Sequence, residues 1–350
     1  MDPTTAMMDT TESTDYTFLT PVEPCNPDSE NSLGAYMSII YYFIFFFSVS
    51  GNVLVLVIIY RFERLTTVTN ILLLNLVFSS LIFVSSLPFW GVYQQLSTWI
   101  FGNPMCKIVG TFYYLGFYSS VLFLTLLTFD RHIAVVYSLS APRMRNHRYA
   151  VISCVVVWVV SSVVCIKEMI LHSTYESTMD GRTYCQDQGG DLDIDAAMRL
   201  RESGFYIQLF LFLIFPLVVI TYCYVRIAIT VLSSQLVTKF KTVRLIFCIV
   251  VLFFVCWTPY NIALLIKEKS LEDDEQTCEE RGSKSAAVHV TRNLTYIYFC
   301  ISPLFYTFVG KKFQNYFRQM MVKRFPRLRK HISVSQQSRS MSTKSTQNGL

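Results

Sequence analysis

The sequence predicts an all-α membrane protein, built as a seven-transmembrane helix bundle with an amphipathic eighth helix. The chain of 350 residues is 52% hydrophobic and 15% charged, whereas a soluble domain carries about 25% charged residues. Apolar segments recur along its whole length, each long enough for a helix to cross ~30 Å of hydrocarbon in about 20 residues. Lipid admits only helices or closed barrels, and these segments lack the alternation of barrel strands, so we expect helices.

The third apolar segment is expected to have one end at each face of the membrane. It runs from Cys106 to Tyr137, and no charged residue lies between Lys107 and Asp130. The cysteine is therefore expected on one side and the Asp130-Arg131 pair on the other. In order along the chain, the predicted spans are 36–60, 68–93, 103–137, 147–172, 203–232, 240–267 and 284–309. Kinks are predicted within four of them by Pro88, Pro216, Pro259 and Pro303.

Charges in the joins between spans orient the bundle. Basic residues follow the first, third and fifth spans, at Arg61, Arg64, Arg143, Arg145, His147, Arg148, Lys239 and Lys241. Acidic residues follow the fourth and sixth, at Asp187, Asp191, Asp193, Asp195, Glu272, Asp273, Asp274 and Glu275. Because short basic loops stay in the cytoplasm, we expect the N-terminus outside the cell and the C-terminus inside. That orientation requires an odd number of spans, and the seven apolar segments satisfy it.

Four regions follow from this arrangement. Residues 1–35 form an acidic extracellular tail, since positions 1–34 hold seven carboxylates and no Lys or Arg. Residues 36–309 form the transmembrane domain. Residues 310–325 place Phe and Met at helical spacing among Lys and Arg, the pattern of an amphipathic helix on the anionic inner leaflet. Residues 326–350 are polar and rich in Ser and Thr, and we expect a disordered cytoplasmic tail.

Several motifs lie in successive spans in one order: GNVLV at 51–55, LNLVFSS at 74–80, TFDRHIAVV at 128–136, Trp158, Pro216 with Tyr224, CWTP at 256–259 and SPLFY at 302–306. Over residues 25–325 this order resembles the rhodopsin-like G-protein-coupled receptors. The resemblance narrows to the chemokine receptors through SLPFW at 86–90, FYSSVLFLTLLTFDRHIAVV at 117–136 and CWTPYN at 256–261. Within that family the XC-class (lymphotactin) receptor is most similar in LTTVTNILLLNL, KTVRLIFCIVV, TRNL at 291–294 and FVGKKF.

The resemblance implies a plasma-membrane receptor. It is expected to bind a basic chemokine of the XC or CC class outside the cell and to activate heterotrimeric G proteins of the Gi family inside, driving chemotaxis and calcium signalling in the immune response. Arrestin is expected to bind the Ser/Thr-rich tail. The lipid bilayer is the remaining partner, with no nucleic acid and no cofactor. The chain is not expected to be an enzyme, because its His and acidic residues match no metal-ligand or nucleophile spacing and it has no phosphate-binding glycine loop.

Two alternatives stay open beside this function. An atypical chemokine-scavenging receptor would take up chemokine without G-protein signalling, and His132 favours this because the family usually has Tyr at that position. A transporter or channel would be favoured by inverted repeats or several membrane-embedded charges, and neither is seen in the sequence.

The four cysteines predicted outside the cell are Cys25, Cys106, Cys185 and Cys278, where oxidation to disulfides is allowed. Four cysteines allow three connectivities, and the sequence alone does not choose among them. The resemblance implies Cys106–Cys185, which ties the second extracellular loop to the third helix. It also implies Cys25–Cys278, which ties the N-terminal segment to the seventh helix. The other six cysteines lie within spans, as buried thiols.

The resemblance also places a ligand pocket in the outer half of the bundle, lined by Tyr41, Trp90, Tyr113, Tyr114, Tyr260, Arg292 and Tyr296. For each aromatic residue, simple core packing is the alternative. Arg292 differs, because an Arg within a span costs about 2.5–3.5 kcal/mol on insertion scales and marks a functional site by default. Most CC and CXC receptors have Glu at this position. Arg292 is expected to favour an acceptor or anion from the inserted segment of the ligand.

The acidic tail carries one further candidate. Tyr16 lies beside Asp15 and resembles the sulfation sites of the family. The tail as a whole would steer a basic ligand toward the receptor by electrostatic attraction. The alternative is a solvated tail without a binding role.

The resemblance implies an activation switch formed by Asp130, Arg131, Tyr224, Trp257, Pro259, Pro303 and Tyr306. Asp130 is expected to hold Arg131 at rest, and activation to release Arg131 toward the G protein, with the two tyrosines as its partners. The alternative is an interfacial Asp-Arg pair that only closes the helix end. Ser80 and Ser302 replace the Asp and Asn of the family's internal sodium site. Because a hard cation prefers carboxylate and amide oxygens, no metal is expected.

Overall fold

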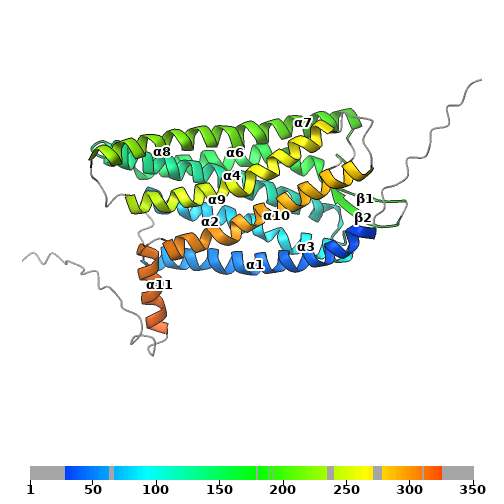
Figure 1. Ribbon diagram of the computed structural model, residues 1–350, viewed down its shortest axis with the longest axis horizontal. Coiled ribbons are helices and arrows are strands. Elements are labelled where there is room, and N and C mark those ends of the chain that lie inside the picture. Colours follow the sequence, from blue (N-terminus) through cyan, green and yellow to red (C-terminus); the bar gives the residue numbers. More distant parts are fainter. Residues whose placement is uncertain are drawn as a thin grey trace, which may run out of the picture.

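The computed structural model describes residues 28–62, 67–178, 180–187, 189–190, 192–234, 240–270, 278–309 and 311–324. Its long helices run side by side along one axis, and a two-stranded hairpin covers one end of the bundle, here called the hairpin end (Figure 1). At the other end the helix Lys311–Arg324 turns across the bundle axis, and this is called the α11 end (Figure 1).

The elements follow one another as α1 (Asp28–Phe62), α2 (Val68–Ser85), α3 (Leu87–Leu96), α4 (Gly102–Val136), α5 (Ala141–Met144), α6 (His147–Leu171), β1 (Ser173–Glu176), β2 (Thr183–Gln186), α7 (Ile194–Leu209), the π-helical turn η1 (Phe210–Ile214), α8 (Phe215–Ser234), α9 (Phe240–Ser270), α10 (Cys278–Val309) and α11 (Lys311–Arg324). The strands β1 and β2 pair antiparallel, with Thr174 opposite Cys185. Each predicted span contains a helix, and helices make up most of the described chain.

Six helical segments of the described chain are long and apolar enough to cross a membrane. They are Met37–Phe62, Val68–Leu96, Gly102–Val136, His147–Leu171, Ile194–Ser233 and Phe247–Lys267. They coincide with the first six predicted spans. Large apolar side chains stay exposed on their outer surfaces, such as Phe46 at 66% and Val163 at 59%. Contact with lipid tails accounts for such exposure, since the cost of exposed apolar surface arises in water.

α10 occupies the position of the seventh predicted span and packs against α9 and α1. It is more polar than the six segments above, because its first turns carry Glu279, Glu280, Arg281 and Lys284. That α10 crosses the membrane stays a prediction on these grounds. α11 corresponds to the predicted amphipathic helix at 310–325, and its contact with a membrane surface likewise stays a prediction.

Two of the prolines act differently from simple kinks. The second predicted span is divided, because α2 ends at Ser85 and α3 begins at Leu87 with Pro88 in its first turn. A proline there has no helical hydrogen bond to lose, and the Ser86 hydroxyl donates to the Phe83 carbonyl oxygen at 2.7 Å. In the fifth span, η1 ends just before Pro216. The wider π-helical turn accommodates a residue that has no N–H and crowds the preceding turn.

The hairpin is anchored to the bundle by a disulfide. Cys185 of β2 is bonded to Cys106, near the start of α4, with their Cα atoms 5.7 Å apart. The backbone N–H of Trp99, in the α3–α4 connection, donates to the Thr183 carbonyl oxygen at 2.7 Å. The structure therefore contains the first disulfide that the resemblance implied. The second falls on Cys25, outside the described residues, and on Cys278, whose side chain is not described.

Aromatic rings fill the centre of the bundle. Phe117 of α4 stacks on Trp257 of α9 with ring centroids 3.7 Å apart, and Phe83 of α2 stacks on Phe299 of α10 at 3.8 Å. Because lipid is as apolar as these side chains, close van der Waals packing holds the helices together. Gly116 permits a close approach of α2 and α4. A Cβ atom there would lie 2.6 Å from the backbone nitrogen of Phe83, so α2 and α4 touch through their backbones.

Candidate functional site

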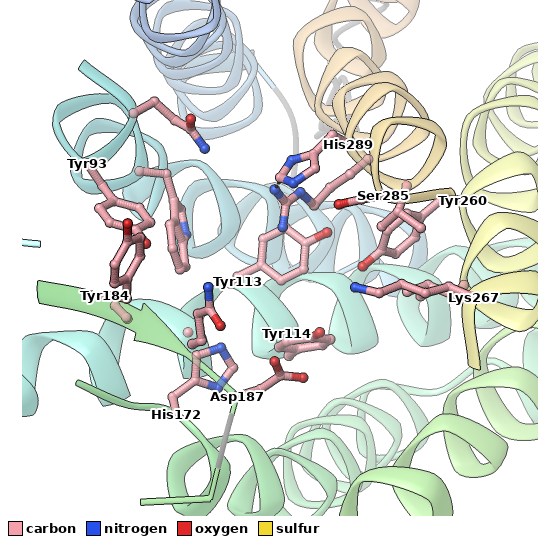
Figure 2. A pocket seen from close by; sticks show the side chains of 18 of the residues that line it. Tyr93, Tyr113, Tyr114, His172, Tyr184, Asp187, Tyr260, Lys267, Ser285 and His289 are labelled. Atoms are coloured by element: carbon pink, nitrogen blue, oxygen red, sulfur yellow. Dashed lines mark hydrogen bonds between the residues drawn. The ribbon is translucent and has the colours of Figure 1, made fainter. Parts of the chain in front are cut away.

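A cavity of about 490 Å³ lies at the hairpin end. Residues of α3, α4, α7, α9 and α10 form its walls together with His172, which directly follows α6, and β2 lies along one side. Figure 2 shows Tyr113 and Tyr114 of α4 at its centre, Tyr260 and Lys267 of α9 on one side, and Tyr184 and Asp187 on another. The cavity is thus shared by segments that are far apart in the sequence.

Six of the seven residues predicted to line the pocket do line this cavity: Trp90, Tyr113, Tyr114, Tyr260, Arg292 and Tyr296. Tyr41 is placed one layer behind them, with its ring edge-on to Tyr296 at 5.3 Å between centroids. Their contact with a ligand stays a prediction. Tyr16, the remaining predicted ligand residue, lies outside the described residues.

The tyrosines form a packed floor. Tyr113, Tyr260 and Tyr296 are only 5%, 4% and 2% exposed, and the rings of Tyr113 and Tyr296 meet edge to face at 6.0 Å. Such edge-to-face pairs are the favoured arrangement of aromatic rings. These residues line the cavity on one side and pack against the core on the other, so their pocket role stays a prediction beside the core-packing alternative.

The floor connects the cavity with the central aromatic stack. Phe83 lies 4.9 Å from Tyr113 and 5.7 Å from Tyr296, measured between ring centroids. Its ring is also 6.3 Å from Trp257, a predicted switch residue. A displacement of the floor could therefore reach Trp257 through the Phe83 ring, or directly through Tyr260, whose ring meets that of Trp257 edge-on at 6.1 Å between centroids.

Two polar groups beside Trp257 link the fifth and sixth predicted spans. Gln208 of α7 donates from Nε2 to Oδ1 of Asn261 in α9 at 3.1 Å. Asn261 donates in turn to the Trp257 carbonyl oxygen at 2.9 Å. Both amides are buried, at 4% and 1% exposed, so breaking this bridge would leave unpaired polar groups in an apolar interior.

Charged residues at the cavity were only partly predicted. Arg292 donates from Nη2 to Nδ1 of His289 at 2.9 Å, and Lys267 also lines the cavity. The sequence offered one signal for His289, because it precedes Arg292 by three residues and so lies on the same helical face. Asp187 pairs with Arg201, with Oδ2 and Nε 3.7 Å apart. The role of Arg292 as a ligand contact stays a prediction.

The fourth predicted span contributes a buried acidic residue that forms ion pairs beside the cavity. Glu168 is 2% exposed and pairs with Lys167, whose ammonium group lies 5.5 Å above the ring of Tyr114. His172 lies 3.7 Å from the same carboxylate and also lines the cavity. A buried charge is tolerable when it is paired. The sequence reading missed Glu168, although two adjacent charges inside an apolar span were a signal for it.

The hairpin carries one further electrostatic contact, outside the apolar segments. The Tyr184 hydroxyl donates to Oδ2 of Asp180 at 2.6 Å. This hydrogen bond holds the pKa of the exposed Asp180 carboxyl below its usual range, since it stabilises the charged form. The contact ties the turn of the hairpin to Tyr184 of β2, which lines the cavity.

At the α11 end, the Asp130 cluster comprises Thr69, Asp130, Arg131 and Arg145. Asp130 is fully buried, and its Oδ2 accepts from Nη2 of Arg131 at 2.6 Å. Arg145 donates from Nε to Oδ1 at 2.6 Å and from Nη2 to Oδ2 at 2.9 Å. Thr69 donates to Oδ2 at 2.9 Å and accepts from both arginines. The predicted Asp130–Arg131 contact is therefore present, and Arg145 adds a two-point contact that the sequence did not indicate.

None of the other predicted switch residues belongs to the Asp130 cluster. Tyr224 contacts Phe247 of α9, with ring centroids 5.1 Å apart, and Pro259 lies inside α9. Pro303 and Tyr306 are part of α10, but their side chains are outside the described part of the structure. The switching role of all these residues stays a prediction.

The family model described as "7 transmembrane receptor (rhodopsin family)" matches residues 51–306. The chain is 35% identical over 313 residues to C-C chemokine receptor type 3 of Cavia porcellus, covering 88% of this chain and 84% of that protein. It is 34% identical over 325 residues to C-C chemokine receptor type 1 of Homo sapiens, covering 92% and 88%. It is 33% identical over 299 residues to the probable C-C chemokine receptor type 3 of Mus musculus, covering 84% and 81%.

Proposed function

Because this chain belongs to the rhodopsin family of seven-transmembrane receptors and, within it, to the chemokine receptors, we propose that it binds a basic chemokine outside the cell and activates Gi-family G proteins inside. Chemotaxis and calcium signalling follow from that coupling. The observation that carries the proposal is the aromatic path from the cavity to Trp257, within a multi-pass membrane bundle whose opposite end holds the Asp130 cluster.

We place the hairpin end outside the cell. The Cys106–Cys185 disulfide lies there, and disulfides persist in oxidising compartments. Arg143 and Arg145 lie at the opposite end, in the short connection between α4 and α6, and Arg148 lies in the first turn of α6. Short basic connections of this kind stay in the cytoplasm. In this orientation α10 is the seventh span and the N-terminus is extracellular.

We place α11 on the inner leaflet as the amphipathic eighth helix. Tyr316 of α11 stacks on Phe62, the last residue of α1, with ring centroids 4.9 Å apart and planes 10° apart. This stack sets α11 across the bundle axis at the level where α1 ends (Figure 1). Its Lys and Arg residues would meet anionic headgroups, and the Ser/Thr-rich tail that follows would bind arrestin.

The ligand class is the finer part of the proposal. The relatives described above are CC-class receptors by name, and an XC-class ligand is favoured by Arg292 and by the motifs that resemble the XC class. An Arg in place of Glu reverses the charge that the ligand meets at that point. The acidic N-terminal tail, with Tyr16, would dock the basic body of the ligand by electrostatic attraction.

In the proposed mechanism, a displacement starts at the tyrosine floor of the cavity and ends at the Asp130–Arg131 pair. The inserted segment of the ligand presses on the tyrosine floor, and Phe83 and Tyr260 pass the displacement to Trp257. Trp257 in turn stacks on Phe117. Movement of α9 then draws Arg131 away from Asp130. Arg145 keeps the buried carboxylate paired when Arg131 leaves, which avoids the large cost of an uncompensated buried charge.

The test is a chemokine panel on cells that express the full chain, with cAMP inhibition and chemokine uptake measured in parallel. Inhibition of cAMP by one chemokine, lost in Arg131→Ala while affinity for the uncoupled receptor stays near wild type, is the expected result. Uptake without any G-protein signal would establish the scavenging alternative. His132 favours that alternative: it is 3% exposed, and its ring lies 5.7 Å from Tyr222. His132→Tyr would then restore signalling if this residue is the cause.

A further inference from the structure

We propose that Arg292, His289 and Lys267 form a carboxylate-binding subsite on the α9–α10 wall of the cavity. The subsite selects ligands whose inserted segment carries an acidic side chain. The inference rests on the proposed function, since it names the chemical group that such a ligand places in the cavity. Of the three residues, only Arg292 was expected from the sequence; His289 and Lys267 come from the geometry.

His289 holds the guanidinium group of Arg292. Nη2 of Arg292 lies 2.9 Å from Nδ1 of His289, one helical turn earlier on α10. An arginine has donors and no acceptor, so Nδ1 must accept and the imidazole proton must sit on Nε2. The ring is therefore neutral in this contact. A guanidinium group held on one side presents its other N–H groups in fixed directions, which a carboxylate can meet with two parallel hydrogen bonds.

One of those N–H groups has no acceptor. Nε of Arg292 is shielded from solvent and lacks a hydrogen-bond partner among the residues that the structure describes. Buried polar groups in folded proteins are nearly always paired. Because Arg292 lines the cavity, a ligand acceptor could pair with this N–H after a small adjustment of the Arg292 side chain, which would remove the cost of the unpaired group.

The charges around the cavity indicate which acceptor. Within the described lining, the cationic side chains are Arg182, Arg201, Lys267 and Arg292, and the one carboxylate is Asp187. Asp187 is paired with Arg201 and lies across the cavity from His289 (Figure 2). The wall that carries Arg292 and Lys267 therefore has an excess of positive charge and no carboxylate of its own among these residues.

A carboxylate fits this wall better than the other acceptors. A backbone carbonyl of the ligand would satisfy the Nε–H of Arg292 but bring no negative charge to this cationic wall. An ammonium group would be repelled. Lys267 extends into the cavity from α9 (Figure 2), so a carboxylate between α9 and α10 would meet two cations. The packed tyrosines around Arg292 lower the local dielectric constant, which strengthens attraction between opposite charges.

The test uses purified full-length receptor in lipid nanodiscs and three small probes, the N-acetyl N-methylamides of Glu, Gln and Lys. Ligand-observed saturation-transfer NMR gives their relative affinities. Wild type should bind the Glu probe about 10- to 100-fold more tightly than the isosteric Gln probe, as expected for charge-assisted hydrogen bonds. The Lys probe should not bind. Arg292→Gln should bring the Glu/Gln ratio close to one, and Lys267→Met and His289→Phe should reduce it.

Arg182→Gln is the matched control, because it removes one positive charge from the same cavity but from the hairpin side. Its Glu/Gln ratio should stay at the wild-type value. Equal binding of the Glu and Gln probes to wild type would overturn the subsite, as would a ratio that Arg182→Gln lowers as much as Arg292→Gln does. If Arg292→Gln does not fold, wild-type ratios in both Lys267→Met and His289→Phe would overturn it instead.

The probes contain no chemokine, so the two proposals fail separately. A receptor that prefers the Glu probe but responds to no chemokine retains the subsite and loses the proposed function. A receptor that a chemokine activates, but that binds the Glu and Gln probes equally, retains the function and loses the subsite.

Discussion

Removing Arg145 should destabilise the resting receptor more than removing Arg131. Arg145 makes two hydrogen bonds to the Asp130 carboxylate, whereas Arg131 makes one. A hydrogen bond to a charged group contributes about 1.5–3 kcal/mol. Arg131→Ala should therefore cost about 1.5–3 kcal/mol, and Arg145→Ala up to about twice as much. The arginine side chains are only 16% and 23% exposed and the carboxylate is buried, so solvent screening is limited.

The double variant should lose more than the sum of the two single losses. Each single variant leaves Asp130 with one arginine, whereas the double variant leaves a buried carboxylate that only Thr69 contacts within the Asp130 cluster. An uncompensated buried charge costs about 3–5 kcal/mol. The coupling energy of the double-mutant cycle should accordingly lie in the range of about 0.5–3 kcal/mol found for residues that share a partner.

Thermal unfolding of the full chain, followed by a thiol-reactive dye, measures these losses. The free cysteines of the described chain are buried or half-buried and become reactive on unfolding: Cys154, Cys165, Cys223, Cys248, Cys256 and Cys300. Arg143→Ala is the control, since Arg143 lies on α5, two residues before Arg145, is exposed and makes no ion pair among the described residues. An unfolding temperature of Arg145→Ala equal to wild type, or a strictly additive double variant, would refute the reasoning.

Three further outcomes are expected. Cys106→Ala should abolish ligand binding at the cell surface because β2 loses its anchor over the cavity; normal binding by surface-expressed variant would contradict this. Sodium should not lower agonist affinity more than potassium does at equal ionic strength, a control for salt screening, since the Ser80 hydroxyl already donates to a backbone carbonyl at 3.0 Å. Ser120 of α4 is fully buried, and its hydroxyl oxygen has no hydrogen-bond partner among the described residues, so a sodium-specific effect lost in Ser120→Ala would be the opposite result. Arg292→Glu should reduce the signalling potency of the native chemokine about 10- to 100-fold, far more than docking to the acidic tail, and Arg292→Lys should recover part of the loss; unchanged potency of Arg292→Glu at matched surface levels would count against a ligand role for Arg292.

The spans could be predicted because hydrocarbon imposes a length and a composition on every crossing segment. Their ends could not. α7 begins at Ile194, nine residues before the predicted start at 203, since a helix continues into water after its apolar part ends. Asp195 in the first turn of α7 favours this extension, because an acidic side chain complements the positive end of the helix dipole. Similarly, α1 begins at Asp28, within the region predicted as tail.

A pocket residue could be predicted where its position on one face of a single helix was enough to place it at the cavity. Six predicted residues line the cavity because their motifs fix the face on which each lies. Arg145 could not be predicted as a partner of Asp130, since it lies in a separate segment and meets Asp130 only after α4 and the following connection fold back. The hairpin was missed for a related reason. Its strands are four residues long, and a bond to Cys106, 79 residues away in the sequence, anchors it.

The backbone contact at Gly116 should fix the distance between α2 and α4, which makes that distance a reference for measuring motion in this receptor. With Gly116 against the backbone of Phe83, any separation or sliding of α2 and α4 would break a tight backbone contact, so the distance between them should stay constant as the ligand binds. Probes attached to these two helices would therefore give a fixed reference frame. A third probe on α9, measured against that frame, would report the displacement of Trp257 alone, free of tumbling or whole-bundle distortion. The glycine at position 116 therefore determines which two helices should carry the reference probes.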